Sequence, residues 1–176
     1  MTLANKITIL RIILIPLFII ALLQKWNWAV LLYIPIMLSD CADGLIARVR
    51  KEQTQLGAFL DPMADRLLLI FTFLTLSYRG MSPRWFLVLV LSRDFLVVIG
   101  WFLFFFITNK KDVSPRVSGK IAVVMQMFLV LFVLASPHGA AMAGTSHFVG
   151  YFLYAAAAAT AWSILDYAFH GIKKFS

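Results

Sequence analysis

The sequence predicts an all-α, polytopic membrane protein with six transmembrane helices and a short N-terminal juxtamembrane segment. Composition is the first reason: the 176 residues are 62% hydrophobic and 14% charged, with a mean hydropathy of +0.89, which exceeds the apolar share of an ordinary soluble domain. The second reason is that a helix needs about 20 predominantly apolar residues to cross a bilayer. Six stretches approach this length: Ile7–Leu23, Trp28–Ile46, Ala58–Leu76, Trp85–Ile107, Ile121–Ala135 and Phe148–Phe169.

Short polar segments separate the first three stretches. No small-residue cleavage site follows Ile7–Leu23, which passes into Gln24 and Lys25, so we expect it to remain in the protein as the first span. The linker Val49–Leu56 is polar and basic. It predicts a short cytoplasmic turn that makes spans two and three antiparallel neighbours.

The last three stretches carry their polar residues in different places. The fourth contains Arg93 and Asp94 near its middle, the fifth follows the polar segment Ser114–Lys120, and the sixth contains one acid, Asp166. We expect Asp166 either to form part of a polar cavity wall or to pair with the nearby Lys173. Because all the connections are short, residues 1–176 are predicted to form a single membrane domain.

The basic residues predict the orientation of the chain. If the N-terminus is cytoplasmic, the opposite side carries only Lys25, Arg79 and Arg84, as the positive-inside rule requires. The cytoplasmic set is Lys6, Arg11, Arg48, Arg50, Lys51, Lys110, Lys111, Arg116, Lys120, Lys173 and Lys174. Both termini are therefore expected on the cytoplasmic side of the cytoplasmic (inner) membrane. The net charge of +8 is attributed to topology and to anionic lipid headgroups, not to nucleic acid.

Four aspartates gather at the junction of spans two and three: Asp40, Asp43, Asp61 and Asp65. Carboxylates in or near the hydrocarbon are costly unless they are paired, neutralised or metal-bound, so they indicate function. The first two are three residues apart and the last two four apart, which places each pair on one face of a helix. Oxygen ligands favour hard cations such as Mg²⁺ or Mn²⁺, and four carboxylates can hold two ions against a phosphoryl centre.

Small residues accompany the aspartates. Gly44 and Ala47 remove bulk from the helix surface one turn beyond the first pair, and Gly57 lies just before the second pair. Small residues alone would indicate close helix packing. Arg48 adds a forked cation that suits a phosphate or nucleotide, so the combination indicates a pocket for a flat ligand.

The spacing of these residues resembles the signature of the CDP-alcohol phosphatidyltransferase family (class I), D-x2-D-G-x2-A-R-x8-G-x3-D-x3-D. Every fixed position is filled between Asp40 and Asp65. The resemblance extends through Asn5, Thr8 and Arg11 and through the six predicted spans, so it covers most of the chain. It is strongest toward the phosphatidylglycerophosphate synthase and cardiolipin synthase branches.

The resemblance implies a six-helix membrane fold, usually a homodimer, with a polar active site that opens to the cytoplasm and to the adjacent leaflet. It implies CDP-diacylglycerol as the donor and the four aspartates as ligands of the divalent ions. Asp65 is also similar to the residue assigned as general base, which takes the proton of an acceptor hydroxyl while CMP leaves. The positions that match the CDP pocket are Asn5, Thr8, Gly44, Ala47, Arg48, Thr54 and Gly57.

The acceptor alcohol stays open between two glycerol-type molecules. The segment Ser114–Lys120 resembles the family region that handles an acceptor phosphate, with Arg116, Ser118 and Lys120 as donors. This favours glycerol 3-phosphate, with phosphatidylglycerophosphate as the product. That branch, however, typically has Arg-Glu in place of Arg93-Asp94, arginine in place of Trp101, and Gly-Lys-x-Lys-Thr at positions 119–123.

Two other segments, Ser92-Arg93-Asp94 and Leu56–Pro62, are similar to the cardiolipin synthase branch, whose acceptor is phosphatidylglycerol. Arg93 either contacts the acceptor or forms a structural ion pair with Asp94. An inositol-phosphate acceptor is a third alternative. An ion channel or solute transporter is an alternative of another class, but it would place polar residues along a whole membrane-crossing path.

Overall fold

The described part of the chain is helical almost throughout. A computed structural model describes residues 3–24, 28–39, 55–108, 117–136 and 147–175, with side chains described within 10–24, 28–39, 64–100, 117–136 and 147–169. The five long helices are α1 (Leu3–Gln24), α3 (Gln55–Tyr78), α4 (Arg84–Thr108), α5 (Val117–Ala135) and α6 (His147–Phe175). A shorter helix, Trp28–Ser39, lies between α1 and α3 in the chain. The all-α class predicted from the sequence is confirmed for this part of the chain.

The helix bounds follow the apolar stretches but differ at several ends. α1 and α5 begin before their stretches, at Leu3 and Val117. α3 begins at Gln55, so the last two residues of the predicted turn Val49–Leu56 are helical. α6 continues beyond the apolar stretch to Phe175 and includes Lys173 and Lys174. Lysines near a helix C-terminus interact favourably with its dipole, which supports this extension. The end of the second stretch, residues 40–46, lies outside the described residues.

Large apolar side chains lie on the outer surface of the bundle as well as in its core. Two helical segments, Val117–Ala135 and His147–Phe169, are long and apolar enough to cross a membrane, and two shorter apolar segments are Leu10–Gln24 and Trp28–Ser39. Large side chains such as Phe95 and Trp162 are 67% and 69% exposed. Such surface is unfavourable in water but is well solvated by lipid tails.

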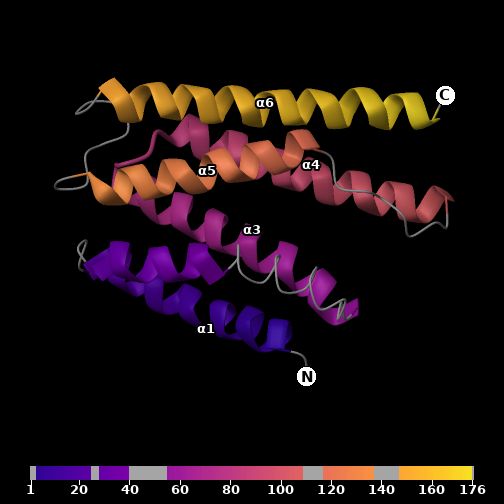
Figure 1. Cartoon of the computed structure of the whole chain (residues 1–176). Helices are drawn as coiled ribbons and strands as arrows, with labels where there is room; N and C mark the ends of the chain where they lie inside the picture. Colours follow the sequence, from indigo (N-terminus) through magenta and orange to yellow (C-terminus); the bar gives the residue numbers. More distant parts are fainter. Residues whose placement is uncertain (1–2, 25–27, 40–54, 109–116, 137–146, 176) are drawn as a thin grey trace.

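The helices lie side by side and alternate in direction (Figure 1). α1 begins and α6 ends on the same side of the bundle, on the right in Figure 1. α3 contacts α1, α4 and α5, while α6 packs on α4 and α5. The first half of α3 and the first turns of α5 therefore belong to the same side of the bundle, which is where the predicted site residues are found.

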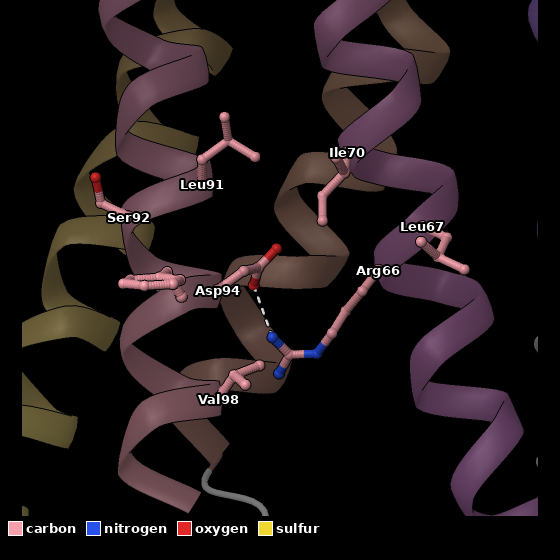
Figure 2. Close-up of a pocket in the computed structure, with 8 residues that line it drawn as sticks. Arg66, Leu67, Ile70, Leu91, Ser92, Asp94 and Val98 are labelled. Carbon is pink, nitrogen blue, oxygen red and sulfur yellow. Dashed lines mark hydrogen bonds and ion pairs between the residues drawn. The ribbon is translucent and has the colours of Figure 1, made fainter. Parts of the chain in front are cut away.

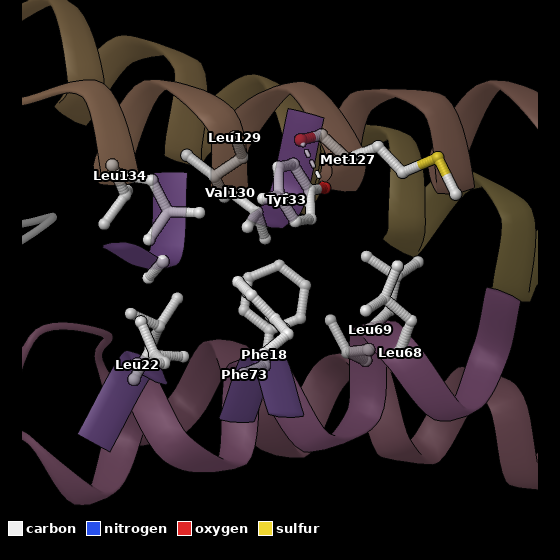
Figure 3. Packing of buried hydrophobic residues seen from close by; sticks show 14 of the residues in the cluster. Phe18, Leu22, Tyr33, Leu68, Leu69, Phe73, Met127, Leu129, Val130 and Leu134 are labelled. Atoms are coloured by element: carbon white, nitrogen blue, oxygen red, sulfur yellow. Dashed lines mark hydrogen bonds between the residues drawn. The ribbon is translucent and has the colours of Figure 1, made fainter. Parts of the chain in front are cut away.

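Aromatic and aliphatic side chains fill the centre of the bundle (Figure 3). Phe18 from α1 and Tyr33 from the Trp28–Ser39 helix are fully buried, and their ring centroids lie 5.5 Å apart. The Tyr33 hydroxyl donates a hydrogen bond of 2.9 Å to the carbonyl of Met127 on α5. This bond satisfies a buried polar group, as a low-dielectric interior requires, and it joins the N-terminal helices to α5.

Two further polar contacts hold helix pairs together. Gln126 of α5 donates to the Thr160 hydroxyl of α6 over 3.0 Å, and Thr160 donates to the carbonyl of Ala156. Arg79, just beyond α3, donates to the carbonyl of Leu22 near the end of α1. Interhelical hydrogen bonds of this kind stabilise membrane bundles, in which the hydrophobic effect between helices is weak.

Candidate active site

The second aspartate pair lies on α3. Asp61 and Asp65 are four residues apart within this helix, so the predicted helical spacing is confirmed and the two residues share a face. The side chain of Asp65 is 21% exposed, while the Asp61 side chain lies outside the described part. Asn5, Thr8 and Gly57 are helical, in α1 and α3. The remaining predicted residues of the metal, CDP and acceptor sets lie outside the described residues: Asp40, Asp43, Gly44, Ala47, Arg48, Thr54 and Arg116.

Arg11 of α1 holds the Asp65 carboxylate. Its Nη1 atom donates to Asp65 Oδ1 over 2.8 Å, and the arginine side chain is only 1% exposed. The two residues are 54 positions apart in the chain, so sequence spacing could not pair them. An arginine inside an apolar stretch does require a partner, and that is the signal from which an acidic partner can be expected. The pair compensates two charges and fixes the direction of one Asp65 oxygen.

Consecutive residues of α3 face different neighbours. A helix turns by about 100° per residue, so Asp65 faces α1 while Arg66 faces α4. Arg66 Nη1 donates to Asp94 Oδ1 over 2.8 Å. Arg66 was not among the site residues predicted from the sequence. Its position inside an apolar stretch, directly after a predicted catalytic residue, was the available signal.

The arginine and aspartate in the middle of α4 do pair. Arg93 Nη1 donates to Asp94 Oδ1 over 2.7 Å. Arg93 Nη2 also donates to the carbonyl of Gly119 over 3.0 Å, and Nε makes a longer contact of 3.5 Å with the Ser163 hydroxyl. Arg93 is 2% exposed. Its guanidinium is therefore directed at protein atoms of α4, α5 and α6.

The predicted acceptor residues of α5 lie at its first turn. The Ser118 hydroxyl donates to Asp166 Oδ2 on α6 over 2.6 Å, and Lys120 is exposed. Both proposals for Asp166, a cavity wall and a lysine partner, left out this serine, because the relative phase of α5 and α6 cannot be read from the sequence. Ser118 and Asp166 thus form one polar contact at the end of the bundle that also carries Asp65.

A groove of about 530 Å³ runs between α3 and α4. Arg66 and Asp94 lie in it with their ion pair across the gap, and Ile70, Leu91 and Val98 form apolar walls (Figure 2). The groove lies on the α4 side of α3, whereas Asp65 faces α1. It therefore lies on a different face of α3 from Asp65.

The donor set suits a hard divalent cation, because carboxylate oxygens are the ligands that Mg²⁺ and Mn²⁺ prefer. Asp61 and Asp65 supply two such groups from one face of α3. In the part of the chain whose side chains are described, no three acidic, histidine or cysteine residues form a potential metal cluster. The first aspartate pair, which would complete the set, lies outside that part.

Known proteins give an independent comparison. A protein from Bacillus subtilis (strain 168), named CDP-diacylglycerol–glycerol-3-phosphate 3-phosphatidyltransferase, is 34% identical over 111 residues, which cover 54% of this chain and 58% of that protein. A protein of the same name from Sodalis glossinidius is 27% identical over 182 residues, covering 93% and 91%. A cardiolipin synthase (CMP-forming) from Streptomyces coelicolor is 31% identical over 106 residues, covering 56% and 49%.

The matched segment thus spans about half the length of most of the curated relatives. The match to a family as a whole is longer. The family model described as CDP-alcohol phosphatidyltransferase matches residues 1–163, which include α1, the aspartate segment, α3, α4, α5 and most of α6. The chain therefore belongs to the CDP-alcohol phosphatidyltransferase family, a family of membrane proteins.

Proposed function

We propose that the chain transfers the phosphatidyl group of CDP-diacylglycerol to the hydroxyl of a glycerol-type acceptor and releases CMP. The observation that carries this proposal is the placement of Asp65. It lies on a helix of a lipid-solvated bundle, one turn from Asp61, with its carboxylate oriented by the buried Arg11. Membership of the family gives this carboxylate its chemical context.

Divalent metal, Mg²⁺ or Mn²⁺, is the proposed cofactor. Its residues are the four aspartates of the signature, Asp40, Asp43, Asp61 and Asp65, which suit two ions per active site. When bound, such ions neutralise phosphate charge and stabilise a leaving phosphate group. The net negative charge of four carboxylates is consistent with a role for bound cations in the folded protein.

Asp65 is the proposed general base. Its carboxylate takes the proton of the acceptor hydroxyl, the acceptor oxygen forms a bond to the lipid-side phosphorus, and the bond from that phosphorus to the CMP oxygen breaks. Arg11 contributes by fixing one carboxylate oxygen through the 2.8 Å contact. A base held in this way loses less orientational freedom when the reaction begins.

The donor nucleotide is expected against the small-residue face that precedes and follows the aspartates. Its proposed residues are Asn5, Thr8, Gly44, Ala47, Arg48, Thr54 and Gly57. Asn5 and Thr8 lie in the first turns of α1, N-terminal to Arg11. Since Arg11 contacts Asp65, these positions are compatible with a pocket near Asp65. Ser118, Lys120 and Arg116 are the proposed contacts of the acceptor.

Relatives of both kinds support a glycerol-type acceptor. The names of the B. subtilis and S. glossinidius proteins specify glycerol 3-phosphate, and the S. coelicolor protein is named as a cardiolipin synthase. For this chain the two candidates are accordingly glycerol 3-phosphate and phosphatidylglycerol, with inositol phosphate as the third. The exposed Lys120 near the start of α5 suits the phosphate group that all three carry.

The proposed setting is the cytoplasmic membrane, with the single domain 1–176 crossing it six times. Both termini and the active site lie on the cytoplasmic side in this proposal, and the alternating helices of Figure 1 support an even number of crossings. A homodimer is proposed on the basis of the family alone.

An assay with three different acceptors tests this function directly. Purified protein in detergent–lipid micelles receives CDP-diacylglycerol and Mg²⁺ together with glycerol 3-phosphate, phosphatidylglycerol or inositol phosphate, and CMP release is measured. We expect acceptor-dependent release with one of the two glycerol-type acceptors and a lipid product of matching mass. Release with none of the three would overturn the proposed function.

A further inference from the structure

One carboxylate oxygen in the bundle accepts hydrogen bonds from two arginines, which belong to two different helices. Asp94 Oδ1 accepts from Arg66 Nη1 of α3 over 2.8 Å and from Arg93 Nη1 of α4 over 2.7 Å. Asp94 is 8% exposed and Arg93 is 2% exposed. The aspartate therefore joins α3 to α4 through two charged contacts, a buried one with Arg93 and a more accessible one with Arg66, whose side chain is 28% exposed. Figure 2 shows the Arg66 arm of this contact crossing the groove.

Arg93 extends the contact from α4 to α5. Its second terminal nitrogen, Nη2, donates to the carbonyl of Gly119 over 3.0 Å. A helix carbonyl in the first turn normally accepts from the amide four residues later, so this carbonyl carries an additional bond from another helix. The three residues Arg66, Asp94 and Arg93 thus form a continuous polar chain from α3 through α4 to the first turn of α5.

The fit at Gly119 is close. A Cβ atom at this position would lie 2.9 Å from Arg93 Nη2 and 3.1 Å from the Tyr167 hydroxyl oxygen. Both distances are shorter than comfortable contact for a carbon atom. The absence of a side chain therefore lets the guanidinium reach the α5 backbone, and the glycine belongs to the same contact as Arg93.

One end of this polar chain lies beside the proposed metal-binding aspartates of α3, and the other end lies beside the proposed acceptor residues of α5. Arg66 directly follows Asp65 on α3, which also carries Asp61. Gly119 lies between Ser118 and Lys120, the proposed acceptor residues of α5. α5 packs mainly on α6 and has few close contacts with α3 or α4, so the chain of polar contacts through Arg66, Asp94 and Arg93 is a direct link from α3 to the first turn of α5.

We infer that Asp94 and Arg93 are positioning residues, which hold the first turn of α5 at a fixed place relative to the α3 aspartates. The inference rests on the proposed function, and it gives Arg93 a role other than contact with the acceptor. The geometry that supports it is the direction of the guanidinium: its three nitrogens face Asp94, Gly119 and Ser163. Because charged hydrogen bonds are strong at low dielectric, the arrangement is stiff.

A single added methyl group tests the inference. In Gly119→Ala the new Cβ displaces the ends of two flexible side chains, Arg93 and Tyr167, and touches no backbone of another helix. Gly100→Ala is the matched control, because Gly100 is also helical and a Cβ there meets nothing within 4 Å. Both changes favour helix formation, so both variants are expected to fold.

The measurement compares the change in KM for the acceptor with the change in KM for CDP-diacylglycerol. We expect Gly119→Ala to raise the KM for the acceptor roughly tenfold, as displacements of about 1 Å in an active site can do. The KM of Gly119→Ala for CDP-diacylglycerol should stay within about twofold of the wild-type value. In the control Gly100→Ala, both KM values should stay within about twofold of wild type. An unchanged acceptor KM in folded Gly119→Ala, or an equal rise in both constants, would overturn the inference.

A second variant approaches the same contact from α3. Arg66→Gln removes one arm of the Asp94 contact at a side chain that lies in the α3–α4 groove, and it leaves Asp94 paired with Arg93. A rise in the acceptor KM that exceeds the rise in the CDP-diacylglycerol KM is expected here too, and its absence contradicts the inference. If the wild-type protein itself releases no CMP with any acceptor, the proposed function fails instead, so the two failures are distinguishable.

Discussion

At the scale of single residues, the charged side chains inside the apolar helices define the chemistry of this chain. Three arginines within these helices make charged contacts: Arg11 with Asp65, and both Arg66 and Arg93 with Asp94. Burial of an uncompensated charge is costly, so removal of one partner is far more harmful than replacement of both. The stability of these helices is therefore linked to the same residues that are proposed to act in the reaction.

Substitution of Arg11 tests this link. Arg11→Met removes the buried cation that contacts the Asp65 carboxylate, and we expect a loss of about 1–3 kcal/mol in the free energy of unfolding, because the Asp65 side chain is 21% exposed. Adding Asp65→Asn to this variant removes the negative charge that faced Arg11 and should return most of the loss. The measurement is unfolding in mixed micelles with increasing SDS. Equal stability of Arg11→Met and wild type, or an undiminished loss in the double variant, would disprove a stabilising role for the pair.

The sequence was informative about which residues matter and less so about which ones meet. Asp65 was predicted from its place in the aspartate pattern, and its contact with Arg11 was not. The Arg93–Asp94 ion pair was one of two alternatives for Arg93, beside a contact with the acceptor, and the structure shows the ion pair. The Arg66 arm and the Ser118–Asp166 contact depend on the rotation of one helix relative to another. That rotation is determined by side-chain packing along the whole interface, which residue spacing within one helix does not specify.

At the scale of helices, the α5–α6 pair shows how the bundle is held together in lipid. Lipid tails are as apolar as leucine, so packing and interhelical hydrogen bonds must supply the stability. The Gln126–Thr160 bond is buried, with the two side chains 1% and 0% exposed. It lies between helices whose apolar length is sufficient to cross the membrane.

A double-mutant cycle measures the strength of this bond. Gln126→Leu, Thr160→Val and the double variant are compared with wild type by SDS-induced unfolding. We expect a coupling free energy of about 0.6 kcal/mol, and no more than about 1.7 kcal/mol, the range found for such bonds in membrane bundles. A coupling of zero would show that the contact does not contribute to stability, whatever its geometry.

The helices themselves were predictable because one physical requirement dominates their formation. Backbone groups in lipid must be satisfied within the segment, so a long apolar stretch is helical almost irrespective of its local propensities. This explains why Leu3–Gln24 is helical even though it contains Pro16. The ends of the helices were less predictable, as the extension of α6 to Phe175 shows. Outside the hydrocarbon core of the membrane, the helical and the coil states of a segment differ little in free energy.

At the scale of the whole molecule, helices that alternate in direction bring the proposed site residues to one side of the bundle (Figure 1). Asp65 in the first half of α3, Ser118 near the start of α5 and Asp166 late in α6 all belong to the side where α1 begins (Figure 1). An enzyme that joins a lipid to an alcohol from the cytoplasm needs its site near one face of the membrane. A channel or transporter would need polar contacts along the full crossing, whereas the centre shown in Figure 3 is packed with apolar side chains.

The central claim is that Asp65 acts in metal-dependent transfer, and the most direct test is CMP release by Asp65→Asn. Glu52→Gln is the matched control, since Glu52 is an acid of the same segment that lies outside the family signature. We predict that wild type and Glu52→Gln release CMP with Mg²⁺ and the acceptor, and that chelation stops both. Folded Asp65→Asn should be slower by about 100-fold or more, the contribution expected of a general base. CMP release by Asp65→Asn at a rate close to that of Glu52→Gln would contradict the account.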